Sequence, residues 1–318
     1  MGTVHLALGI LLAVTLPAAA QETRIAALNF APEDRPSGTT LPELVNGVAQ
    51  LAPDLRIQVL PGGAIAPFRI ATDLRQRQID LASLAPLYYR AIMPMADALE
   101  LIERSPSELR RNGAFDYLDK LHGEAMNVHL LGLFGIGARY RIYLRDRRIE
   151  RLSYENVRLL APPNAIALAK KMEALLMQMP PAEVPDALER GVIEGLIVPS
   201  LDVAANGWAK LLKFKVDPGF NSAVWVILMN RASWNALSAA HRDALARAAE
   251  TLETVDAQLA AQRDAQTRRI EEAAGVTTIK LGDADAATLV SAARDIGWES
   301  MSQIDPEIAK RLRKLLAK

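Results

Sequence analysis

Apolar and polar positions alternate along the first hundred residues in a way that predicts strands separated by amphipathic helices. The apolar runs 23–30, 55–61 and 79–85 are typical of strands, and the segments 37–52 and 68–78 carry apolar residues on one helical face. We expect Ser37 or a following Thr to cap the first helix. This order indicates a parallel sheet, which binds ligands beside the carboxyl ends of its strands.

The pattern predicts a second α/β unit at roughly 126–214. After a charged helical region at 96–125, we expect a strand at 127–135, a polar hairpin at 138–155, a strand at 156–164 and a helix at 165–178. In segment 181–200, Val184, Ala187 and Leu188 share one helical face and Gly191 ends the helix. A short apolar strand then leads into a loop at Pro199.

The last hundred residues have a helical period. From Ser238 to about Ala273 the pattern is helical almost without a break, which corresponds to a length of roughly 50 Å and suffices to span two lobes. The apolar positions that recur every three or four residues are Leu245, Ala248, Leu252, Val255 and Leu259. A strand at 276–281 and two further amphipathic segments follow.

Composition and charge narrow the class of protein. A chain of 318 residues suggests about two domains, and half of its residues are apolar. Lys and Arg together equal Asp and Glu at 37 each, so no net charge favours nucleic acid or an anionic membrane. Cys is absent from the sequence, so neither a disulfide nor a thiol nucleophile is expected.

The N-terminus has the features of a signal peptide. An apolar run of about a dozen residues is shorter than the ~20 needed to span a bilayer, and it ends in Ala18, Ala19 and Ala20. The preceding residues "MGTVH" contain no Lys or Arg, which departs from the usual pattern. We predict a signal peptide at 1–20, cleavage after about Ala20, and export to a bacterial periplasm.

Motifs for catalysis, metals or cofactors are absent from the sequence. The four His lack metal-ligand spacing, and neither GxSxG nor a phosphate-binding glycine motif occurs. The glycine-rich stretch 132–139 ends in Arg139, which is either a ligand contact or one exposed residue of a basic segment. Trp208, Trp225 and Trp234 are more typical of a core than of a ligand platform. A binding protein is therefore favoured over an enzyme, with no cofactor or metal.

Four segments in order resemble the DctP family of TRAP-transporter solute-binding proteins. Residues 55–83 are similar to its strand–PGG–helix–GxIDMA motif, and 137–164 to "G-x-R…DLKGLKIRVPxN". Residues 181–200 are similar to "xxEVYxALQxGxVDGxENP", and 228–237 to "xxNKxxWxxL". The resemblance implies a two-lobe periplasmic-binding-protein fold of class α/β, with a hinge and a long C-terminal helix that spans both lobes. It also implies delivery of a small molecule, usually an organic acid, to a membrane permease.

Two departures from the family pattern fall in the implied ligand site. Leu160 stands where the family has a carboxylate-binding Arg, and Val198 stands where it has a polar Asn. Arg158 precedes Leu160 by two residues and is an imperfect substitute, because it starts roughly 7 Å further from the strand end. Arg139 matches the retained Arg of "G-x-R". Loss of two polar contacts favours a largely apolar ligand.

These observations define the predicted lobes and ligand site. The first lobe comprises 21–125 with 215–252, and the second comprises 126–214 with 253–318, the long helix being at about 238–273. The predicted ligand-binding residues are Phe30, Leu84, Tyr88, Phe134, Arg139, Leu160, Val198 and Trp225.

The functional hypotheses belong to different classes. The first is a periplasmic receptor for a hydrophobic ligand, either lipid-like or a monocarboxylate whose acid end meets Arg139, which delivers it to a permease or another envelope transport component. The second is a conventional organic-acid receptor in which other residues, Arg158 among them, bind the acid. The third is a sensory or scaffold protein that needs no ligand.

Overall fold

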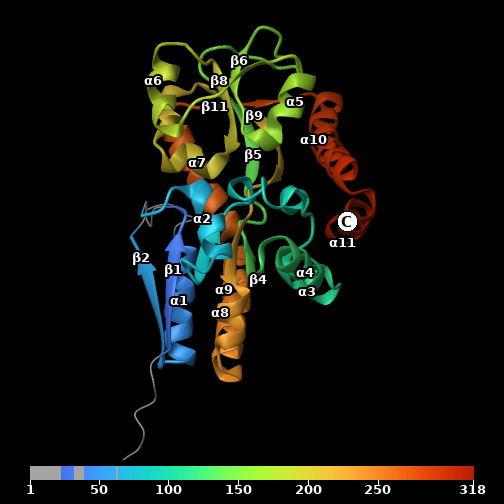
Figure 1. The fold of residues 1–318 in the computed structure, drawn as a ribbon. Helices are drawn as coiled ribbons and strands as arrows, with labels where there is room; N and C mark the ends of the chain where they lie inside the picture. The colour runs from blue at the N-terminus through green and yellow to red at the C-terminus, as the bar shows by residue number, and fades with distance from the viewer. Residues whose placement is uncertain (1–22, 32–38, 62–63) are drawn as a thin grey trace, which may run out of the picture.

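The computed structural model, which describes residues 23–31, 39–61 and 64–318, contains two α/β lobes stacked along its long axis (Figure 1). The first lobe is built around a five-stranded sheet and the second around a six-stranded sheet. The predicted α/β class with two lobes is confirmed. The predicted signal peptide and Ser37, one of the proposed caps, lie outside the described residues. The following Thr39 stands at the N-cap of the first helix but makes no side-chain capping hydrogen bond.

The sheet of the first lobe is mixed, with strand order β2-β1-β3-β10-β4. The predicted βαβαβ unit forms its parallel part, because β1 pairs in parallel with both β2 and β3. Strand β10 returns from the second lobe and runs antiparallel to β3 and β4. The strands are β1 (Thr23–Asn29), β2 (Leu55–Leu60), β3 (Leu81–Leu84), β4 (Val128–Phe134) and β10 (Trp225–Asn230).

Helices cover both faces of this sheet. Helix α1 (Thr40–Leu51) buries Leu41, Leu44 and Val48 against one face. The opposite face is covered by α2 (Pro67–Arg75), by the 3-10 helix η2 (Pro94–Leu101) and by α4 (Ala114–Met126). The remaining short elements of the lobe are η1 (Pro86–Tyr88), α3 (Pro106–Arg111) and α8 (Arg231–Ala236).

The sheet of the second lobe has the order β11-β9-β5-β8-β6-β7. The predicted hairpin at 138–155 is wrong, because β5 is an inner strand that runs antiparallel to β8 and β9. Ile142, Tyr143 and Leu144 are buried there, so the chain leaves the sheet only at Arg145. The strands are β5 (Arg139–Leu144), β6 (Arg158–Leu160), β7 (Leu175–Met177), β8 (Gly195–Pro199), β9 (Phe214–Ser222) and β11 (Thr277–Lys280).

The predicted helix at 165–178 is half as long as expected. Helix α5 (Ile166–Lys171) ends because Glu173 adopts a positive φ of 66°, and the apolar residues that follow form β7. Helix α6 (Val184–Glu189) is confirmed, with the three predicted apolar residues buried and Gly191 at φ 70°. The other helical elements here are η3 (Pro163–Ala165), η4 (Pro181–Glu183), α7 (Ser200–Ala205) and η5 (Trp208–Leu211).

The predicted long helix is confirmed as α9 (Ala239–Ala273). Its first turn is capped by Ser238, whose hydroxyl accepts a hydrogen bond from the His241 backbone N–H. The helix contacts α1 and β4 in the first lobe and α7 and η5 in the second, so it connects the two (Figure 1). Within the described ranges, no helix combines the length and apolar character that crossing a bilayer requires.

The sheets divide the chain at different positions from those expected. Strand β4 belongs to the first sheet and β9 to the second, so the chain crosses between lobes at 135–138 and 223–224 rather than near 126 and 214. Gly135 has a φ of 77°, and a Cβ there would overlap the Ala223 carbonyl and the Trp225 ring. The predicted close backbone approach in the glycine-rich stretch is therefore present.

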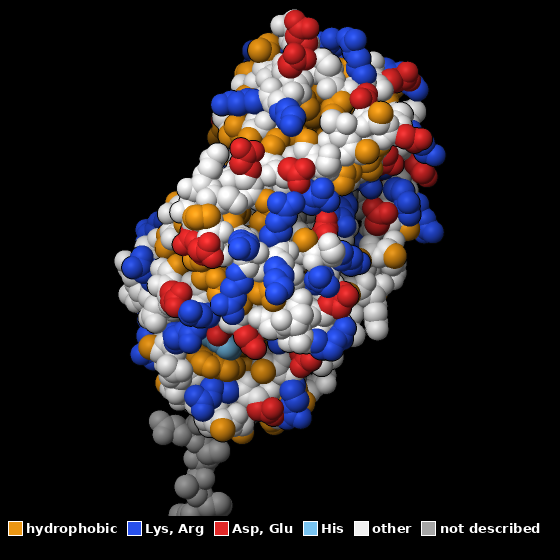
Figure 2. Space-filling model, turned by 90° about the vertical axis from the view of Figure 1, so that its right-hand side faces the viewer, with side chains coloured by type: hydrophobic (Ala, Val, Ile, Leu, Met, Phe, Trp, Pro, Cys, Tyr) orange, Lys and Arg blue, Asp and Glu red, His pale blue; other side chains and the backbone are white. Residues whose placement is uncertain are grey.

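The C-terminal helices also join the lobes. Helix α10 (Asp283–Ile304) packs on β9 and α5 in the second lobe and on η2 in the first. Helix α11 (Pro306–Leu316) buries Ala309, Leu312 and Leu316 in the first-lobe core, although the sequence placed 253–318 in the second lobe. Figure 2 shows acidic and basic side chains interspersed on a face of the molecule turned by 90° from the view of Figure 1.

Candidate functional site

A cleft of about 600 Å³ between the lobes is the candidate site. Both sheets contribute to it, and several of its residues follow the carboxyl ends of strands, where ligands bind in α/β sheets. The first lobe supplies Phe30, Phe68, Ala85, Leu87, Tyr88, Glu100, Val224 and Trp225. The second lobe and the crossing segment supply Tyr140, Leu160–Pro163, Gln178–Pro180, Val184, Ile197–Pro199, Leu201, Asp202, Trp208 and Ala223.

The first-lobe wall of the cleft is aromatic. Tyr88 lies at the centre of this wall, because its ring is 5.7 Å from that of Phe30 and 5.1 Å from that of Phe68. Phe68 is 67% exposed and extends this aromatic surface toward solvent. Trp225 and Trp208 add buried apolar surface from either lobe. The geometry suits an apolar ligand body.

Five of the eight predicted site residues line this cleft together. They are Phe30, Tyr88, Leu160, Val198 and Trp225.

The other three predicted site residues lie outside the lining. Leu84 and Phe134 have no exposed surface and pack in the two cores of the first lobe. Arg139 begins β5, is half-buried, and its Nη1 donates to the Ser222 hydroxyl over 3.4 Å. Burial lowers the pKa of Arg139.

Arg158 does not line the cleft, where the family pattern has a carboxylate-binding Arg. Its guanidinium donates to the backbone carbonyls of Val192 and Gly191, each at 3.0 Å, and forms an ion pair with Glu194 at 3.3 Å. These contacts hold it at the turn before β8, whereas the cleft is lined by Leu160 at the other end of β6.

Sequence reasoning missed Glu100, the most unusual residue of the cleft. It lies on η2, is 4% exposed, and accepts a hydrogen bond from the Tyr140 hydroxyl at 3.2 Å and another from the Asn164 side-chain amide. Burial raises the pKa of Glu100 to about 8, which exceeds the lowering effect of these two hydrogen bonds. The available signal was a lone acid in the apolar run "ALELI" at 98–102.

Asn164 adds a second polar feature beside Glu100. Its amide nitrogen donates to the Glu100 carboxyl, while its buried Oδ1 has no hydrogen-bond partner among the described residues. A buried acceptor without a partner is costly, and such atoms cluster where a ligand or water supplies the missing donor.

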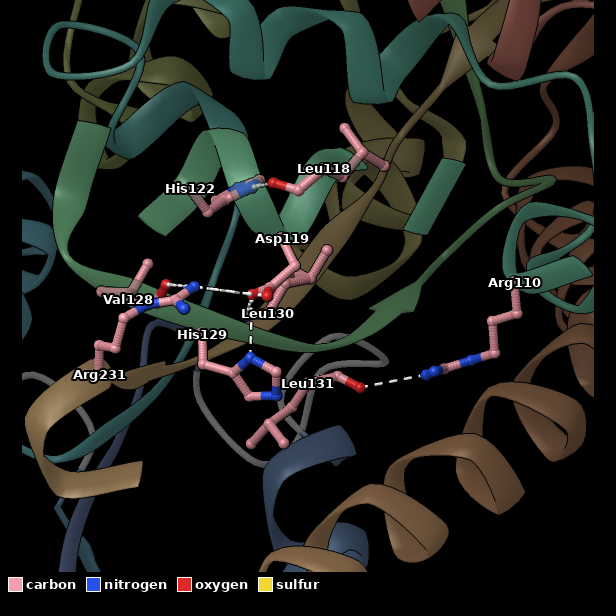
Figure 3. Close-up of polar contacts among 9 residues, drawn as sticks. All are labelled: Arg110, Leu118, Asp119, His122, Val128, His129, Leu130, Leu131 and Arg231. Carbon is pink, nitrogen blue, oxygen red and sulfur yellow. Dashed lines mark hydrogen bonds and ion pairs between the residues drawn. The ribbon is translucent and has the colours of Figure 1, made fainter. Parts of the chain in front are cut away.

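His122 and His129 of the first lobe are held by contacts within the fold (Figure 3). His129 contacts Asp119 at 2.9 Å and stacks on Trp234. His122 is buried, bonds to the Leu118 carbonyl at 2.8 Å, and burial lowers its pKa to about 4. Among the described residues, no group of His, Asp and Glu side chains is arranged to hold a metal ion.

Polar contacts around Asp119 join three elements of the first lobe. Asp119 on α4 accepts from the Leu130 backbone N–H of β4, and Arg231 of α8 donates to Asp119 and to the Val128 carbonyl (Figure 3). This network holds the sheet and its helices together and lies apart from the cleft lining.

The fold is shared with solved structures of periplasmic solute-binding proteins. A protein of Desulfovibrio salexigens with bound orotic acid has a TM-score of 0.80 at 14% identity, covering 92% of this chain and 97% of its own. A Bordetella pertussis receptor that binds pyroglutamic acid has a TM-score of 0.78 at 15% identity, covering 93% and 100%. A marine metagenome protein specific for aromatic acids has a TM-score of 0.77 at 19% identity, covering 94% and 100%.

The fold and the cleft resemble those of two-lobed solute-binding receptors, a class of proteins that are not enzymes. The model of the bacterial extracellular solute-binding protein family 7, DctP, matches residues 148–303. Over these residues the chain is similar to this family, whose members are extracytoplasmic.

Proposed function

We propose that this receptor closes its two lobes on a largely hydrophobic ligand and delivers it to a membrane permease or another envelope transport component. The observation that carries the proposal is the presence of Leu160 and Val198 in one apolar cleft with the aromatic wall around Tyr88. Export would follow removal of residues 1–20, and the crossing segments at 135–138 and 223–224 would serve as the hinge.

Desolvation energetics support an apolar ligand. Burying a carboxylate costs several kcal/mol unless a cation or several donors compensate it. Among the described residues that line the cleft, none is Lys, Arg or His. Apolar contact instead contributes roughly 25 cal/mol for each Å² removed from water.

The alternative is a conventional organic-acid receptor. It is favoured by the acids named for the similar structures and by the half-buried position of Arg139 near the crossing segment. In that case Arg139 would have to approach the ligand when the lobes close.

Binding of the neutral fluorescent probe N-phenyl-1-naphthylamine tests the proposal. We expect fluorescence to rise with the wild-type protein and to be lost in Val198→Asp, because a carboxylate in the cleft wall opposes apolar binding. Val192→Asp is the matched control, since Val192 is 40% exposed and lies outside the cleft lining.

The two hypotheses give opposite results in a thermal screen. Stabilisation by succinate, malate or 3-hydroxybenzoate, without binding of the neutral probe, would establish the organic-acid receptor instead. A ligand at a hundred times its dissociation constant stabilises by about 2.7 kcal/mol, which such a screen detects.

A further inference from the structure

We propose that Glu100 determines ligand specificity, and that the ligand presents an ammonium group to it rather than a carboxylate. This inference rests on the proposed function, because it takes the apolar cleft as the binding site. The proposal specifies the chemical group at the polar end of the ligand, which the apolar walls of the cleft do not determine.

Glu100 has no ion-pair partner among the described residues, and burial raises its pKa to about 8. The unliganded protein therefore holds this carboxyl largely protonated at pH 7, and a bound ammonium group would favour its ionised form. Its two oxygens accept hydrogen bonds from neutral groups, the Tyr140 hydroxyl and the Asn164 amide. Among the described residues, no Lys, Arg or His forms an ion pair with it. The nearby Arg90 is already bound to Asp97, with Nη2 and Oδ2 2.5 Å apart. A buried carboxyl of this kind is complementary to a cation.

The hydrogen-bonding capacity around Glu100 points to the same head group. In its ionised form each Glu100 oxygen retains a lone pair after its one hydrogen bond. The buried Oδ1 of Asn164 has no partner among the described residues. An ammonium group offers three donors and no acceptor, so it matches acceptors on both residues. A ligand carboxylate offers only acceptors and leaves Asn164 Oδ1 without a donor.

Charge in the rest of the cleft favours the same choice. Asp202 on α7 is the second acidic residue of the lining, and the described lining contains no basic residue. An anionic ligand would therefore find no basic side chain in the described lining, whereas a cationic one would be attracted by the ionised form of Glu100.

Three probes that share one apolar body and differ in the head group test this inference. They are 4-phenylbutylamine, 4-phenylbutan-1-ol and 4-phenylbutyrate. Their dissociation constants for the mature protein are measured by calorimetry at pH 9, where Glu100, with a pKa of about 8, is ionised and an alkylamine keeps its proton. We expect the amine to bind at least about tenfold more tightly than the butyrate, with the alcohol between them. Charge-assisted hydrogen bonds have at least this effect on affinity.

Variants separate recognition from a merely structural role of Glu100. Glu100→Gln should weaken amine binding about tenfold, leave the alcohol within about threefold, and reduce the preference for amine over butyrate. The control Glu124→Gln changes a 61% exposed acid on α4 and should leave all three constants unchanged. A structural role alone would weaken the three probes equally.

The outcomes distinguish this inference from the function on which it rests. Equal or tighter binding of the butyrate by the wild-type protein would overturn the ammonium assignment while leaving the apolar site intact. Failure of the alcohol, the amine and the neutral fluorescent probe to bind would overturn the proposed function itself. The wild-type comparison needs no variant, so it decides the question even if Glu100→Gln does not fold.

Discussion

Glu100 couples the chemistry of the cleft to the stability of the fold. Its pKa is about 8 in the folded protein because of burial, against 4.5 for a solvated Glu. Between pH 4.5 and pH 8 the folded protein retains a proton that the unfolded chain releases. The contribution of Glu100 therefore lowers the free energy of unfolding as the pH rises through this range. Other groups also act on the pKa of Glu100 or of its hydrogen-bond donor Tyr140. They are Asp97, Arg90, Asn164, Tyr140 and Asp202.

Glu100→Gln should remove this contribution. We expect the free energy of unfolding of the wild-type protein to fall by a few kcal/mol between pH 5 and pH 8, beyond the change seen in the variant. Urea denaturation of both proteins across this range measures the difference, with Glu124→Gln as a surface control. Parallel pH profiles for wild type and Glu100→Gln would show that the carboxyl is not desolvated.

At single positions, the sequence predicted the apolar part of the site better than its polar part. Leu160 and Val198 stood out because they replace polar residues in recognisable motifs, and both line the cleft. Glu100 gave no such signal, because one acid in an apolar segment acquires its meaning only from Tyr140 and Asn164, which are distant in the sequence. Leu84 points into a core, whereas Ala85 beside it lines the cleft, since successive strand residues face opposite sides.

Among the elements, α9 is fixed to both lobes by buried acids. Glu253 accepts from the Leu133 backbone N–H of β4 at 2.7 Å, and Asp256 accepts from the Gly135 N–H at 2.9 Å. Further along the helix, Glu271 contacts the Tyr143 hydroxyl at 2.6 Å and Lys215 Nζ at 2.5 Å in the second lobe. These contacts explain how a helix with few buried apolar residues in its second half keeps its position.

Replacing Glu271 tests this role of α9. Glu271→Ala leaves Lys215, which is 4% exposed, as an uncompensated buried cation, and we expect a loss of about 3–5 kcal/mol. The neighbouring Glu272 is exposed, so Glu272→Ala should cost less than about 0.5 kcal/mol. Chemical denaturation compares the two, and equal effects would contradict an anchoring role for Glu271.

Helices and strands were predicted correctly where one apolar repeat continues over many residues. They were predicted wrongly where a strand pairs with strands that are distant in the sequence. The 35-residue helix α9 was evident from its repeat, since many positions reinforce one pattern. Strand β5 was misread as part of a hairpin because its partners, β8 and β9, lie some fifty or more residues away. The split of 165–178 into α5 and β7 depends on the backbone of Glu173, and a short apolar run fits either structure.

For the molecule as a whole, four connections join the lobes around one cleft. The crossing segments 135–138 and 223–224 are short, whereas α9 and α10 contact both lobes along their lengths. The sequence indicated two α/β units and a connecting helix, but it did not show that α11 packs on the first lobe. Contacts between chain ends and distant elements leave no local pattern in the sequence.

The identity of the molecule carried in this cleft is the central claim at this scale. Native mass spectrometry of the purified full-length or processed protein, followed by denaturing extraction and small-molecule mass spectrometry, tests it most directly. The account predicts a bound molecule that partitions into organic solvent and is displaced in Val198→Asp but not in Val192→Asp. Recovery of a polar organic acid, or an empty protein that small organic acids stabilise, would contradict it.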